Sequence, residues 1–156
     1  MGFLPPDERV DPEAALLQAL AYNGIPYRKE KDGARFAFCD GGRRWETVCR
    51  YAPQTVVVYG VYPFPVADRA RALEGINAAG AALARGGLFL SGDRIVLRVG
   101  ADLFDAYSAG EAVTRALEYS AGAMVHLWGR MANCAQGAGV FDRKGTNNQR
   151  NQEKTE

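Results

Sequence analysis

The chain has 156 residues, enough for one domain with a real core, and its 19 basic and 18 acidic residues leave a net charge of only +1. So balanced a composition argues against a nucleic-acid or polyanion partner. The sequence has no apolar run long enough to span a bilayer, and residues 1–10 lack the pattern of a signal peptide. We therefore expect a soluble cytoplasmic protein with no membrane partner.

The residues that most often carry chemistry are few and scattered. Three cysteines, Cys39, Cys49 and Cys134, form no Cys-x-x-Cys pair, which indicates reduced thiols instead of disulfides or a metal site. His126 is the only histidine. It could form a nucleophilic triad with a cysteine and Asp102, but nothing in the spacing brings these groups together. We predict no catalytic residue, no metal and no cofactor, and hence no enzyme.

The first third of the chain predicts a helix followed by short strands. Residues 1–10 are polar and rich in proline, as in a flexible arm. Asp11-Pro12-Glu13 is a strong helix start, and Asn23-Gly24 is a typical stop. Three strands should follow, separated by turns that contain glycine: residues 25–29, 34–39 and 45–51.

The centre of the chain predicts a hairpin that leads into a helix. Residues 45–51 and 55–62 are rich in β-branched and aromatic side chains, with 52–54 as the turn. Pro63 and Pro65 should end the sheet, because proline has no backbone donor. From residue 66 to 85 the apolar spacing becomes helical. The expected buried stripe of this helix is Val66, Ala70, Leu73, Ile76, Asn77, Gly80 and Leu83.

The last third predicts a second hairpin, residues 88–90 and 94–99, and a final helix. Ser108 and Glu111 have the spacing of a capping box, and the helix should run to about Cys134. Its expected stripe is Val113, Leu117, Ser120, Met124, Leu127, Trp128 and Met131. Residues 137–156 are polar and rich in Asn and Gln, which predicts a disordered tail.

The order of these elements predicts the fold class. One helix, three or four strands, a helix, two strands and a helix favour an α+β domain over residues 11–136. Its sheet should be mostly antiparallel, with the helices packed on it.

Pairing through the turn at 52–54 would sort the side chains of the central hairpin onto two faces. One face would carry Trp45, Thr47, Cys49, Tyr51, Val56, Val58 and Tyr62. The other would carry Glu46, Val48, Arg50, Val57, Tyr59 and Val61. That second face is too apolar for a sheet open to water, yet it contains charge, as a dimer interface or a peptide-docking surface does. A covering helix of the same chain, or a register shifted by one residue, would account for the pattern equally well.

The order of elements and several local patterns resemble the YbjN-like family of proposed bacterial sensory transduction regulators, whose fold is like that of type III secretion chaperones. The matching segments are residues 20–27, 56–64, Ile76-Asn77, 87–90 and 108–111. The resemblance covers roughly residues 11–134. It implies an α+β domain that associates as a dimer and has no established catalytic residues. The chaperone relatives hold extended client segments, but they tend to be acidic, whereas this chain is nearly neutral.

Two functions follow as expectations. The first is a non-catalytic protein-binding module, chaperone-like or regulatory, acting as a small homodimer that holds a segment of a partner protein. Its predicted interface residues are Val48, Val57, Tyr59 and Val61. The alternative is a small-molecule sensor or enzyme, with a pocket between the sheet and the last helix lined by Trp45, Met124 and Trp128.

Overall fold

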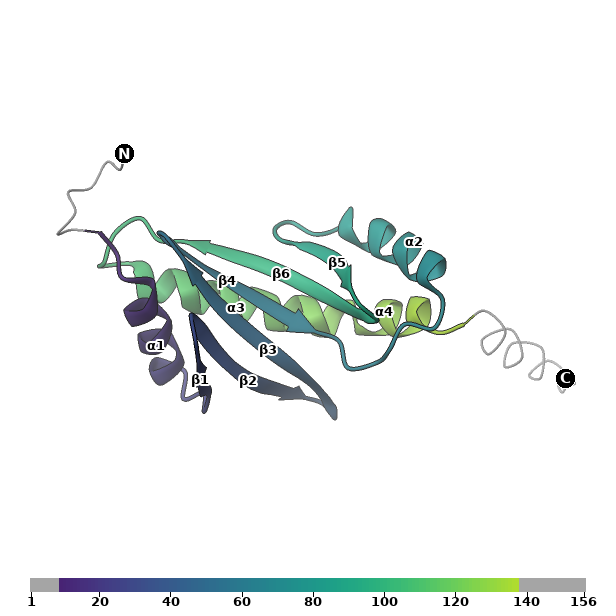
Figure 1. The fold of residues 1–156 in the computed structure, drawn as a ribbon, viewed down its shortest axis with the longest axis horizontal. Coiled ribbons are helices and arrows are strands. Elements are labelled where there is room, and N and C mark those ends of the chain that lie inside the picture. Colours follow the sequence, from purple (N-terminus) through teal and green to yellow (C-terminus); the bar gives the residue numbers. More distant parts are fainter. Residues whose placement is uncertain (1–8, 138–156) are drawn as a thin grey trace, which may run out of the picture.

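Six antiparallel strands and four helices make up the part of the chain that the structure, a computed structural model, describes: residues 9–137 (Figure 1). The elements are α1 (Pro12–Tyr22), β1 (Arg28–Glu30), β2 (Gly33–Asp40), β3 (Arg43–Ala52), β4 (Thr55–Val61), α2 (Arg69–Gly80), β5 (Gly87–Ser91), β6 (Arg94–Asp102), α3 (Ala109–His126) and α4 (Trp128–Ala135). The predicted α+β class is confirmed. Most of the expected arm and almost all of the expected tail lie outside the described residues.

The strands form one sheet in the order β1-β2-β3-β4-β6-β5. The first four strands are a meander, and β6 pairs with β4, so the second hairpin extends the first. In the central hairpin Cys49 lies opposite Val58, and Val48 lies opposite Tyr59. This pairing places the side chains on the two faces expected, although the turn is Pro53-Gln54, one residue shorter than expected, because Ala52 still pairs with Thr55. Gln54 takes a positive φ of 60° there.

The described helices lie on one side of the sheet or beyond its edge. Figure 1 shows α3 and α4 behind the strands. Leu16 and Leu20 of α1 and Val113 and Leu117 of α3 share one apolar core with the strand residues that point to this side. The strand members of the core include Trp45, Cys49, Val56, Val58, Ile95, Leu97 and Val99. The opposite side of the sheet carries no helix of residues 9–137.

The ends of α1 follow the predicted chemistry. The Asp11 carboxylate accepts a hydrogen bond from the Glu13 amide at 3.1 Å, and Pro12 occupies the first turn. Gly24 follows the helix with a φ of +65°, a conformation that side chains rarely adopt. None of the helices in the described part of the chain is both long and apolar enough to cross a membrane.

The second helix is shorter than predicted and turns another stripe inward. It begins at Arg69, because the Asp68 side chain accepts from the Arg71 amide and caps the helix there. Its buried residues are Ala72, Ile76 and Ala79. Of the expected stripe only Ile76 is buried, and Leu73 is 43% exposed. The register was wrong because the sequence is rich in Ala and Gly, so alternative stripes differ little in hydropathy.

The last predicted helix is two helices that meet at Leu127. The residues of its expected stripe are buried, apart from Trp128, which is half-buried. The capping box does not form. The Ser108 hydroxyl instead donates to the Asp105 carboxylate at 3.1 Å. An Asp three residues earlier thus occupies the hydroxyl that the capping box requires.

Candidate protein-binding face

All four predicted interface residues lie on the side of the sheet away from the helices, which we call the open face. Val48 and Tyr59 are directly paired across β3 and β4, and Val57 and Val61 flank Tyr59 on β4. The alternation that points Val56 and Val58 into the core places these residues on the other side. No helix of residues 9–137 covers this face, and the hairpin register is not shifted by one residue, so neither accounts for its apolar character.

The centre of the open face is a floor of valines shielded by larger neighbours. Val48, Val57 and Val96 are only 9%, 7% and 5% exposed, although none of them belongs to the helix-side core. The ring of Tyr59 meets that of Phe89 edge-on, with centroids 6.4 Å apart. This second apolar cluster is separated from the core by the thickness of the sheet.

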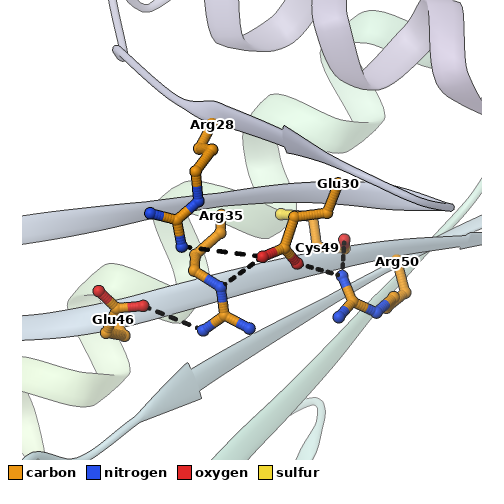
Figure 2. A network of polar contacts seen from close by, with 6 residues as sticks. All are labelled: Arg28, Glu30, Arg35, Glu46, Cys49 and Arg50. Atoms are coloured by element: carbon orange, nitrogen blue, oxygen red, sulfur yellow. Dashed lines mark hydrogen bonds and ion pairs between the residues drawn. The ribbon is translucent and has the colours of Figure 1, made fainter.

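A network of charged side chains occupies the β1–β3 end of the open face (Figure 2). Glu30 of the edge strand β1 lies at its centre. Its carboxylate accepts from the Arg35 Nε at 2.7 Å and from an Arg50 nitrogen at 3.2 Å, with Arg28 at 3.8 Å. Arg35 also donates to the Glu46 carboxylate at 3.1 Å. Strands β1, β2 and β3 are thus linked by side chains as well as by the backbone ladder.

The network changes the protonation equilibria of its members. The hydrogen bond from Arg35 holds the pKa of the Glu30 carboxyl below its ordinary value of 4.5, and Arg50 acts in the same direction. The pKa of Arg35 is raised by its bonds to Glu30 and Glu46. Both pKa shifts favour the charged forms of Glu30 and Arg35, so the ion pairs of the network persist at neutral pH.

The open face also contains residues that the sequence argument did not assign to it. Because β6 pairs with β4, Val96 lies beside Val61 and Arg98 lies beside Tyr59 on the open face. Phe89 of β5 lies on the other side of Val96. The spacing of Arg94 and Arg98 against buried Ile95, Leu97 and Val99 showed that they face the wetter side. The sequence alone did not show that β4 and β6 are paired in the sheet.

The residues considered for nucleophilic chemistry are kept apart. Cys49 lies in the core, where burial raises the pKa of its thiol to about 12. Cys39 lies on the open face beside the β2–β3 turn, whereas Asp102 pairs with Thr55 at the opposite end of the strands. His126 is the last residue of α3, whereas Asp102 lies near the first, so the 18 residues of this helix separate the two side chains. Within residues 9–137 no three His, Cys, Asp or Glu side chains converge on a possible metal position.

The residues expected to line a small-molecule pocket pack against one another or against Tyr62. The rings of Trp45 and Trp128 lie 5.7 Å apart, and Tyr62 packs on Trp128 at 5.5 Å. The Tyr62 hydroxyl donates to the Met124 carbonyl at 3.0 Å, which closes the contact between sheet and helix. A hollow of about 370 Å³ lies instead on the surface between α1 and α3, beside the exposed ring of Tyr22.

These features define a class of protein: an α+β domain with helices on one side of an antiparallel sheet and an apolar, charge-bordered second side. No family model and no curated protein matches the sequence. The structure is similar to that of YbjN from E. coli, a proposed transcription regulator, with a TM-score of 0.57 and 13% sequence identity. The match covers 77% of this chain and 93% of YbjN. The predicted YbjN-like fold is confirmed, and at this identity the likeness concerns the fold alone.

Proposed function

We propose that this chain is a non-catalytic protein-binding module, regulatory or chaperone-like, that works in the cytoplasm as a small dimer and holds a segment of a partner protein. The open face is the proposed docking surface. Val48, Val57, Tyr59 and Val61 are its anchors, and the charged network around Glu30 forms its border.

One observation carries this proposal: the sheet has apolar side chains on both sides, and the described helices cover only one. Continuous apolar strands indicate burial on both sides. An apolar cluster that no described helix covers, with a charged border, has the composition of a protein interface. The fold neighbour is a proposed regulator, which agrees with a non-catalytic role. Three cysteines without a disulfide in the described part of the chain suit a reducing compartment.

The test compares the full chain with Tyr59→Asp and with Tyr22→Asp. Tyr59→Asp places a charge in the valine floor, whereas Tyr22, 83% exposed on α1, offers the same substitution away from it. Circular dichroism and thermal melts first establish that all three fold. Light scattering after size exclusion then reports the oligomeric state, and cross-linking in a cell extract reports bound partners.

We expect both the wild-type chain and the Tyr22→Asp variant to be dimers. Loss of the dimer in Tyr59→Asp alone would place the self-contact on the open face. A retained dimer with loss of cross-linked partners would make this face the client site. A wild-type monomer whose cross-linked partners persist in Tyr59→Asp would contradict the proposal.

A further inference from the structure

The open face has an excess of arginine that the nearly neutral chain as a whole does not show. By strand alternation its arginines are Arg28, Arg35, Arg44, Arg50, Arg94 and Arg98. The acidic residues of the same strand faces are Glu30, Glu46 and Asp102. Against a net charge of +1 for the whole sequence, this surface concentrates positive charge.

The excess is not evenly distributed. At the β1–β3 end, Arg28, Arg35 and Arg50 share the carboxylate of Glu30. Arg94 pairs with Asp93 of the neighbouring turn at 3.1 Å. Arg44 and Arg98, in contrast, are exposed and form no ion pair with any described residue. Arg44 lies beside the β2–β3 turn and donates to the Cys39 sulfur at 3.5 Å, whereas the guanidinium of Arg98 is available to a carboxylate from outside.

Arg98 also stands directly beside the predicted anchors. It lies opposite Tyr59 on β4 and next to Val96 on its own strand. One row across the sheet reads Arg35, Val48, Tyr59, Arg98, with apolar residues between two arginines. A planar guanidinium binds carboxylates in two-pronged geometry, and such pairs at the edge of an apolar floor confer selectivity.

The charge decides between the possible occupants. A second copy docked face to face would set one arginine excess against another, which costs free energy. A nucleic acid would meet a face on which four of the six arginines are already paired with carboxylates, whereas nucleic-acid surfaces present a strong positive field. An acidic protein segment with an apolar side chain complements both the guanidinium and the apolar cluster.

We propose that the segment held on the open face is acidic: one carboxylate binds Arg98, and an adjacent apolar side chain packs on Tyr59, Val61 and Phe89, the accessible part of the apolar cluster. This inference rests on the proposed function and specifies its partner. Arg98 selects the charge, and the apolar cluster provides the apolar contact.

The spacing of the row suggests the pattern of the segment. Strands lie about 4.8 Å apart, so Arg35 and Arg98, three strands apart, are separated by about 14 Å. Residues i and i+4 of an extended chain point to the same side at about 13 Å. A segment laid across the strands with an acid at i, on Arg98, and an apolar residue at i+2 would fit, whereas the residue at i+4 would meet Arg35, which Glu30 and Glu46 already hold.

The experiment is a selection from a displayed library of random twelve-residue peptides on the immobilised full chain. The same library is selected on Arg98→Glu, on Tyr59→Asp and on Arg130→Glu, a charge reversal at an exposed position of α4. Enriched peptides are synthesised, and their affinities are measured by fluorescence anisotropy beside a labelled single-stranded oligothymidine. Circular dichroism confirms that each variant is folded.

We expect wild type and Arg130→Glu to enrich acidic peptides with an apolar residue two positions from an acid, and Arg98→Glu to bind them about tenfold more weakly and to select basic peptides instead. Neutral or basic peptides from the wild type, lost with Tyr59→Asp, would overturn the acidic inference and leave the docking face intact. If Tyr59→Asp enriches the same peptides as the wild type, the open face is not the docking surface. If the wild type binds oligothymidine more tightly than any peptide, and Arg98→Glu weakens that binding, the inference would also be overturned, in favour of a nucleic acid.

Discussion

At the scale of single residues, Glu30 is the side chain on which the charged end of the open face depends. Three arginines approach its carboxylate, and β1 contains no apolar residue that could hold it to the sheet otherwise. Exposed ion pairs stabilise little individually, but a shared carboxylate orders several side chains at once. Its contribution to the global stability should therefore be small, and its larger effect should be on the order of the surface.

This predicts a pH dependence. The pKa of Glu30 is lower in the folded state than its ordinary value of 4.5, so its contribution is complete above about pH 5.5 and is lost as the pH falls through the lowered folded pKa. In Glu30→Gln, urea unfolding from pH 7 to pH 3 should show a stability deficit at pH 7 that shrinks below about pH 4.5. A deficit that stays constant down to pH 3 would contradict the network.

The thiols make a second residue-scale prediction. Cys39 is exposed, whereas Cys49 and Cys134 are buried, and burial raises the pKa of both buried thiols. A disulfide reagent at pH 8 should therefore modify one thiol rapidly and the other two only at the rate at which the chain opens. Cys39→Ser should remove the rapid phase. Rapid modification of two thiols per chain in the wild type would contradict the burial of Cys49 and Cys134.

At the scale of elements, the contact between α2 and α4 depends on one glycine. A Cβ placed on Gly75 would overlap the Cβ of Cys134, so the two helix backbones approach at a distance that only glycine allows. Gly60 has a similar role on β4, where a Cβ would come within 2.9 Å of the Met124 sulfur. Glycines thus set two close approaches in the packing of helices.

We expect Gly75→Ala to destabilise the protein by about 1–3 kcal/mol, because overpacking outweighs the gain of about 1 kcal/mol in helix propensity. Gly122→Ala on α3 is the matched control. A Cβ there meets no atom within 4 Å, so this variant should gain about 0.5–1 kcal/mol. Denaturant unfolding gives both values. Stabilisation by Gly75→Ala would mean that α2 and α4 are farther apart than described.

The elements also show what the sequence could and could not predict. The register of the β3–β4 hairpin followed from a short turn and from strict alternation, both of which are local. This is why Val48, Val57, Tyr59 and Val61 could be placed on one face. The stripe of α2 could not be predicted, because buried Ala72 and Ala79 look like the exposed alanines beside them. Arg98 joined the site only through the pairing of β4 with β6, which no local pattern encodes.

At the scale of the whole molecule, the sheet has a firm centre and a weaker border. β3, β4 and β6 are paired on both sides and contribute to two apolar clusters, whereas β1 has three residues and one neighbour. Local opening should therefore begin at β1 and spread inwards.

Native-state hydrogen exchange tests this gradient. The β4 and β6 amides should be the most protected and should exchange only on global unfolding, whereas those of β1 should exchange several orders of magnitude faster. Glu30→Gln should accelerate exchange in β1 and at the paired residues of β2, and should leave β6 unchanged. Equal protection of β1 and β4 would show that the sheet opens as one unit.

The two borders of the sheet have a consequence for how the protein meets other chains. An unpaired strand is a template on which foreign strands can assemble without limit. Here one border is the short, fully charged Arg28–Glu30, and the other, β5, lies beside α2. Both borders therefore resist the addition of another strand. In the proposed function, contacts with other chains use the broad side of the sheet, which offers no free strand edge on which a fibre could grow.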